Sequence, residues 1–68
     1  MAGAEMSRIR HVVIIDGRTY WRDIGHAGVR FYYVRRGNGK SMILDARHEK
    51  RKAEVDAAIA KQYGEAAR

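Results

Sequence analysis

Arginine, lysine and tyrosine side chains between residues 29 and 52 are the groups in this sequence whose types and spacing best suit binding chemistry. In the stretch VRFYYVRRGNGK, three aromatic residues stand just before a pair of arginines and two glycines. Guanidinium groups bind phosphate oxygens through paired hydrogen bonds, aromatic rings stack on bases, and glycines let a ligand approach the backbone. The pattern predicts contact with a nucleic acid.

The formal net charge of +6 is concentrated in the same region. Residues 30–52 contain eight basic and two acidic residues, and the segments on either side are nearly balanced. A compact basic region is the usual electrostatic footprint of a polyanion binder. We predict double-stranded DNA as the partner, and the predicted nucleic-acid-binding residues are Arg30, Tyr32, Arg35, Arg36, Lys40, Arg47, Lys50, Arg51 and Lys52.

Catalytic and metal-binding patterns are missing from the sequence. Ser7 and Ser41 are the only serines, and neither lies in a nucleophile-elbow motif. The histidines are far apart in sequence and no cysteine accompanies them, so no metal-ligand spacing occurs. We therefore expect a non-enzymatic protein with no catalytic residue, no cofactor and no metal.

Two strands joined by a tight turn are expected first. Residues 9–15 include four consecutive β-branched residues, which favour a strand over a helix. Asp16-Gly17 then predicts a two-residue hairpin turn, and residues 18–24 form the returning strand. Its alternation places Trp21 and Tyr20 on opposite faces, and we expect Trp21 to be a core side chain.

The next strand is predicted from Val29 into the Gly37-Asn38-Gly39 turn. Alternation sends one set of its side chains to each face of the sheet. We expect the set with Phe31 and Tyr33 to face the core, and the set with Arg30, Tyr32 and Arg36 to meet a partner.

A fourth strand over residues 40–44 and one helix complete the expected fold. Asp45 is predicted to cap a helix over residues 46–63, in which Val55, Ile59 and Tyr63 form an apolar stripe, and Gly64 ends it. The predicted fold class is therefore α+β, a three- or four-stranded antiparallel β-meander with one C-terminal helix packed on one face. We expect residues 8–64 to form a single domain, with a disordered N-terminus over residues 1–7 and a frayed C-terminus over residues 65–68.

The order FYYVRR-GNG-KSMILDAR-HEKRKAEVDAAIA resembles the amino-terminal arm-binding domain of phage tyrosine recombinases, the integrases, over roughly residues 18–63. The resemblance implies that the sheet enters the DNA major groove, with Arg30, Tyr32, Arg35 and Arg36 as its contacts. The sequence departs from the family in having an extra apolar strand at residues 12–15 and no catalytic domain after the helix. It therefore implies an accessory factor or regulator from a phage or mobile element.

Two other functions remain open. Small orphan domains of mixed charge also resemble phage-encoded inhibitors, including anti-CRISPR proteins, which bind a protein partner, although such inhibitors are often acidic. A small virion assembly component would pair through an exposed edge strand, and such an edge also permits a homodimer. The sequence has no cysteine and no apolar run of the roughly 20 residues that span a bilayer, so we expect a cytoplasmic protein without membrane contact.

Overall fold

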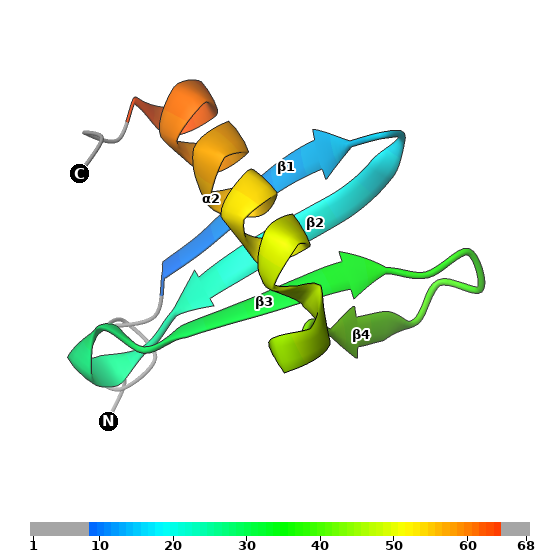
Figure 1. Cartoon of the computed structure of the whole chain (residues 1–68), viewed down its shortest axis with the longest axis horizontal. Coiled ribbons are helices and arrows are strands. Elements are labelled where there is room, and N and C mark those ends of the chain that lie inside the picture. The colour runs from blue at the N-terminus through cyan, green and yellow to red at the C-terminus, as the bar shows by residue number, and fades with distance from the viewer. Residues whose placement is uncertain (1–8, 65–68) are drawn as a thin grey trace.

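The computed structural model describes residues 9–64, in which four antiparallel strands form one sheet and a helix crosses one of its faces (Figure 1). The strands follow chain order across the sheet, so the topology is a meander. Their bounds are β1 Ile9–Ile15, β2 Arg18–Ile24, β3 Arg30–Arg35 and β4 Ser41–Ile43; a short 3₁₀ helix, η1 His26–Gly28, joins β2 to β3. The predicted α+β class is confirmed, and the predictions for residues 1–7 and 65–68 lie outside the described residues.

The β1–β2 hairpin turns at Asp16-Gly17, as predicted. Both residues have positive φ, 53° for Asp16 and 77° for Gly17, and the strands pair from Ile15 and Arg18 onward. A two-residue turn of this kind matches the right-handed twist of the strands that it joins.

The C-terminal helical segment begins with a 3₁₀ turn, η2 Ala46–His48, and continues as α2 Glu49–Tyr63. The Asp45 carboxylate accepts a hydrogen bond from the Arg47 backbone N–H at 3.0 Å, and the His48 ring accepts one from the Asp45 N–H at 3.3 Å. This reciprocal capping tightens the first turn, so the α-helix starts three residues later than predicted. Gly64 ends it in the left-handed conformation, as predicted.

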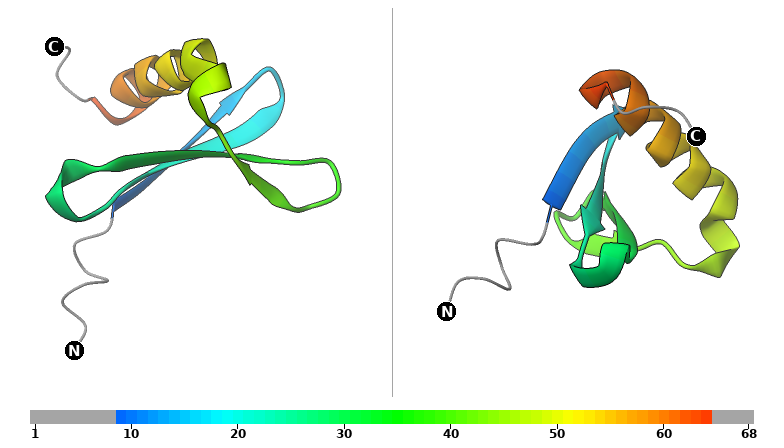
Figure 2. Two further views of the ribbon diagram at one scale, coloured as in Figure 1. Left: turned by 60° about the horizontal axis from the view of Figure 1, so that its bottom comes forward. Right: turned by 90° about the vertical axis from the view of Figure 1, so that its left-hand side faces the viewer.

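The core lies between α2 and the sheet face that it covers (Figure 2). Val55 and Ile59 supply the buried helix side chains, and Tyr63, the third residue of the predicted stripe, is 46% exposed. The sheet contributes buried side chains from β1 to β3 and from the residue after β4: Val13, Tyr20, Tyr32, Val34 and Leu44. Within residues 9–64, no helix combines the length and apolar character needed to cross a membrane.

The two faces of β3 are the reverse of the sequence-based prediction. Tyr32 and Val34 are buried under α2, whereas Phe31 is 43% exposed on the other face. Register explains the outcome, because Val34 pairs with Tyr20, a core residue of β2. Both sets of β3 side chains include aromatic residues, so alternation alone could not decide which set the helix covers.

Candidate nucleic-acid interface

Tyr32, predicted as an exposed contact, belongs to a polar network beneath α2. Its hydroxyl lies 3.0 and 2.9 Å from the two carboxylate oxygens of Asp56 and donates to that carboxylate. Arg22, which is 1% exposed, donates to the same carboxylate at 2.9 Å. Burial raises the pKa of Tyr32 above its ordinary value. The prediction that Tyr32 faces a partner is therefore wrong.

Arg30 lies on the same helix-covered face as Tyr32. Its Nη1 atom is 3.5 Å from the Asp56 carboxylate, although half of its side chain remains exposed. The charge of Arg30 is thus partly compensated within the protein. It does not share a surface with Arg35, because the two residues project from opposite faces of β3.

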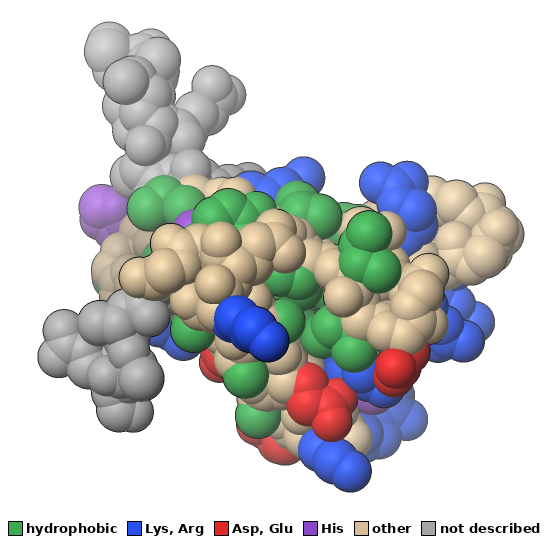
Figure 3. Space-filling view, turned by 90° about the horizontal axis from the view of Figure 1, so that it is seen from above, with side chains coloured by type: hydrophobic (Ala, Val, Ile, Leu, Met, Phe, Trp, Pro, Cys, Tyr) green, Lys and Arg blue, Asp and Glu red, His purple; other side chains and the backbone are tan. Residues whose placement is uncertain are grey.

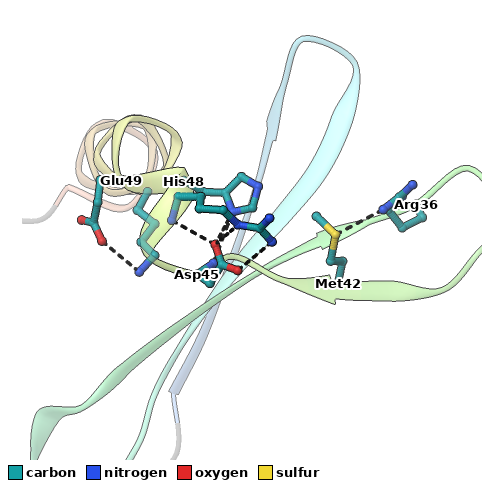
Figure 4. A network of polar contacts seen from close by, with 7 residues as sticks. Arg36, Met42, Asp45, His48 and Glu49 are labelled. Atoms are coloured by element: carbon teal, nitrogen blue, oxygen red, sulfur yellow. Dashed lines mark hydrogen bonds and ion pairs between the residues drawn. The ribbon is translucent and has the colours of Figure 1, made fainter.

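The basic residues of η2 and α2 are mostly paired with carboxylates, and Figure 4 shows Asp45 and Glu49 in such contacts. The pairs are Arg47 with Asp45 at 3.0 Å, Arg51 with Asp16 at 3.4 Å and with Glu54 at 3.0 Å, and Lys52 with Glu49 at 3.4 Å. Hydrogen bonds from Arg47 lower the pKa of Asp45 to about 2. In the described part of the chain, Lys50 has no such partner, so it is the exception among the four predicted cations of this region.

The β3–β4 hairpin carries basic residues whose charge is not compensated in this way. Among residues 9–64, no carboxylate pairs with Arg35, Arg36 or Lys40, and the same holds for Arg18 at the start of β2. Arg36 donates through Nη1 to the Met42 sulfur at 3.2 Å, a weak and uncharged acceptor (Figure 4). The hairpin extends beyond the part of the sheet that α2 crosses (Figure 1), so its cations are presented to solvent.

The space-filling view agrees with this difference between paired and unpaired cations. In Figure 3, acidic side chains lie among lysines and arginines in the lower half of the view, on the side of the helix. The upper half, towards the other side of the sheet, has lysine, arginine and hydrophobic side chains and no acidic ones in sight. In this view, acidic side chains are therefore seen only on the helix side.

We call the sheet face away from α2 the open face. Strand register assigns its side chains to alternate positions of all four strands. They are Arg10, Val12 and Ile14 of β1, Thr19, Trp21 and Asp23 of β2, Phe31, Tyr33 and Arg35 of β3, and Ser41 and Ile43 of β4.

A cation–aromatic cluster lies at the centre of the open face. The rings of Trp21 and Tyr33 stack with centroids 5.6 Å apart and an angle of 16° between their planes. The guanidinium carbons of Arg10 and Arg35 lie 5.5 and 5.7 Å from the centroid of the Trp21 ring. These contacts fix the two arginines at cation–π distance and cover Trp21, which is only 8% exposed.

The two arginines of the cluster differ in their electrostatic environment. Arg10 forms two hydrogen bonds to the Asp23 carboxylate, at 2.7 and 2.8 Å, and this contact raises its pKa. Arg35 has no comparable carboxylate within residues 9–64. Arg35 is therefore the residue of the cluster that is best placed to bind an anion.

Apolar side chains surround the cation–aromatic cluster. Ile14 is 70% exposed, Ile43 50%, Phe31 43% and Val12 39%. A continuous face of aromatic and aliphatic groups, with arginines among them, is unusual for a surface that meets only water.

Of the predicted binding residues, Arg35, Arg36 and Lys40 lie at one end of the sheet, with Arg35 on the open face and Arg36 beside Met42 on the other face. The open face also contains Arg10, Trp21 and Tyr33, which the sequence-based prediction did not select. The sequence did contain a signal for this face. Trp21 alternates with Tyr20 and Arg22 along β2, so its ring must lie on the face opposite those two side chains. The charge count drew attention to residues 30–52, whereas the site also draws on β1 and β2.

Comparison with protein-family models finds no match to this chain, and comparisons with curated proteins and with solved structures find none either.

Proposed function

We propose that this protein binds double-stranded DNA through the open face and the β3–β4 hairpin. The observation that carries the proposal is the position of Arg35. It lies over the Trp21 ring at 5.7 Å and continues into a hairpin whose cations have no carboxylate partner within residues 9–64. Phosphate groups of DNA would supply the missing negative charge.

The shape of the hairpin supports DNA as the partner. The major groove of B-DNA, about 12 Å wide, admits a two-stranded β-ribbon. The β3–β4 hairpin is such a ribbon, and it projects from the body of the molecule (Figure 1). Arg35 and Ser41 pair across its open face, while Arg36 and Lys40 bracket its turn. In this arrangement Arg35 meets base edges or phosphates, and the turn residues meet the backbone.

The aromatic and apolar groups of the open face have a role in the same proposal. Sugar rings and thymine methyl groups offer apolar surface to a protein in the groove. Exposed side chains such as Ile43 and Phe31 can cover that surface, and Tyr33 can stack or pack at its edge. The resemblance to the arm-binding domain of phage integrases implies the same use of the sheet, and a regulator or accessory factor of a phage or mobile element is the role that we propose.

Fluorescence anisotropy of a labelled duplex, titrated with the protein at several salt concentrations, tests the proposal. Arg35, Arg36 and Lys40 of the hairpin would neutralise about three phosphates, so log K should fall with log salt with a slope of about −2 to −3. Emission of the single tryptophan, Trp21, should change on binding, because Arg35 and Tyr33 surround it. Absence of binding even at low salt would contradict the proposal.

Two matched double variants distinguish direct contact between these arginines and DNA from the general electrostatic attraction between a basic protein and DNA. Arg35→Gln/Arg36→Gln removes two charges and keeps most of the side-chain stem that covers Trp21. Lys50→Gln/Lys61→Gln removes the same charge from exposed positions of α2, on the other side of the sheet. We expect at least a tenfold loss of affinity for the first variant and less than a threefold loss for the second. Equal losses would place the interface elsewhere.

A protein partner is the second candidate, and the exposed aliphatic residues favour it. Ile14 and Val12 have no role in the DNA proposal, and exposed aliphatic residues form the cores of protein interfaces. The class would then be a phage-encoded inhibitor, such as an anti-CRISPR protein, or a virion component. A complex of fixed stoichiometry whose affinity hardly changes with salt would favour this alternative.

A further inference from the structure

A hollow of about 610 Å³ opens between the β1–β2 and β3–β4 hairpins. One wall is formed by the first hairpin, with Gly17, Arg18 and Thr19. The other is formed by the second hairpin, with Val34, Arg35, Arg36, Gly37 and Met42. The β2–β3 ladder ends nearby, at the pair of Tyr20 and Val34. Beyond that pair the two hairpins diverge (Figure 1), and the hollow occupies the space between them.

Like charges meet across this hollow. If the β2–β3 register continued past its last pair, Arg18 would stand opposite Arg36. Two cations in such positions repel one another, which disfavours pairing unless an anion lies between them. No acidic residue lines the hollow. The nearest carboxylate in sequence, Asp16, is 3.4 Å from Arg51 of α2 and is partly compensated by that contact.

The lining suits a phosphate group with its attached sugar. Planar guanidinium groups bind phosphate oxygens in a bidentate manner, and Arg18 and Arg36 line the hollow from its two sides. At Gly17 and Gly37, no atom lies within 4 Å of the position that a side chain would occupy, so a ligand can approach the backbone there.

We propose that the hollow is a phosphate site that holds one phosphodiester of the DNA backbone, with Arg18 and Arg36 on opposite sides of it. This inference rests on the proposed function and adds Arg18, a residue of the first hairpin, to the interface. A single phosphate held by both hairpins would fix the angle of the sheet on the duplex.

Arg18→Gln tests the site, with Lys61→Gln as a control that removes one charge from α2. We expect Arg18→Gln to make the slope of log K against log salt shallower by about one, and the control to leave the slope unchanged. Wild-type slope in Arg18→Gln, with DNA binding retained, would overturn the phosphate site and leave the proposed function intact.

A second experiment tests whether the hollow binds phosphate when no DNA is present. The protein is titrated with inorganic phosphate, with chloride at equal ionic strength as the control, and its amide resonances are followed by NMR. Amide resonances of Gly17, Arg18 and Gly37 should shift with phosphate in the wild type and not in Arg18→Gln/Arg36→Gln. Absence of these shifts in the wild type would overturn the site. If phosphate shifts these resonances but the protein binds no DNA, the proposal that the hollow holds a DNA phosphodiester is wrong, and so is the proposed function. The ligand of the hollow would then be a small phosphate ester.

Discussion

Tyr32 and Tyr33 are neighbours in sequence, yet their surroundings assign them different roles. The Tyr32 hydroxyl donates to the Asp56 carboxylate under α2, and Tyr33 stacks on Trp21 on the open face. Buried hydroxyls need a partner, and the helix supplies one only on the face that it covers. Tyr32 therefore has a structural role, whereas Tyr33 lies on the face that we propose for binding.

Replacing Tyr32 by Phe should therefore affect stability and leave DNA binding unchanged. The variant removes a hydrogen bond to a partly exposed carboxylate, so we expect a loss of about 1–2 kcal/mol in the free energy of unfolding. Tyr33→Phe is the matched control, since it keeps the ring that stacks on Trp21, and its stability should change by less than about 0.5 kcal/mol. Urea unfolding measures both values; a weaker duplex affinity in Tyr32→Phe would restore the original assignment of this residue to the interface.

Alternation along β3 was predictable from the sequence, but its orientation was not. The two sets of side chains, one with Phe31 and Tyr33 and one with Tyr32 and Val34, are similarly apolar. What decides between them is pairing with Tyr20 in β2 and the position of Asp56 on a helix distant in sequence. Such long-range contacts leave no local pattern, so a single sequence carries little information about them.

At the scale of elements, turns and caps were predicted best because they depend on local chemistry. Asp16-Gly17, Asp45 and Gly64 occupy the turn, N-cap and C-cap positions expected of them.

The attachment of α2 to the sheet was not predictable in this way. The Tyr63 hydroxyl lies 3.1 Å from both the N–H and the carbonyl of Val12, and the Gln62 side chain donates to the same carbonyl. These contacts occupy the backbone groups of Val12 in β1, which is an edge strand of the sheet.

The cap at Asp45 predicts how stability depends on pH. Its pKa is lowered from 3.8 to about 2 by hydrogen bonds from Arg47, so the folded state prefers the ionised carboxylate. This contribution to stability is fully present above about pH 4 and is lost as the pH falls towards 2. Asp45→Asn keeps a capping acceptor without the charge. Thermal unfolding should show wild type more stable than the variant at neutral pH, with the difference shrinking between pH 4 and pH 2; a difference independent of pH would mean that the charge has no part in the cap.

At the scale of the whole molecule, the sequence shows which segment holds the basic residues, but not which of them are paired with carboxylates. The charge of residues 30–52 was expected to form one patch. The fold divides it instead, because Asp45 and carboxylates of α2 pair with most cations of η2 and α2. The cations of the β3–β4 hairpin have no such partner within residues 9–64. Ion pairs between neighbouring turns depend on rotamers and on helix phase, which a charge count does not include.

This division predicts that position, and not net charge, governs DNA binding. Arg36→Glu/Lys40→Glu and Lys50→Glu/Lys61→Glu both lower the formal net charge from +6 to +2, since each exchange removes two positive units. Long-range attraction depends on the summed field, so both variants should associate more slowly at low salt. Only the hairpin variant should also lose its phosphate contacts. We therefore expect its affinity for DNA at physiological salt to be at least tenfold lower than that of the helix variant. Stopped-flow association and equilibrium anisotropy measure the two effects, and equal affinity losses in the two variants would mean that general attraction alone accounts for binding.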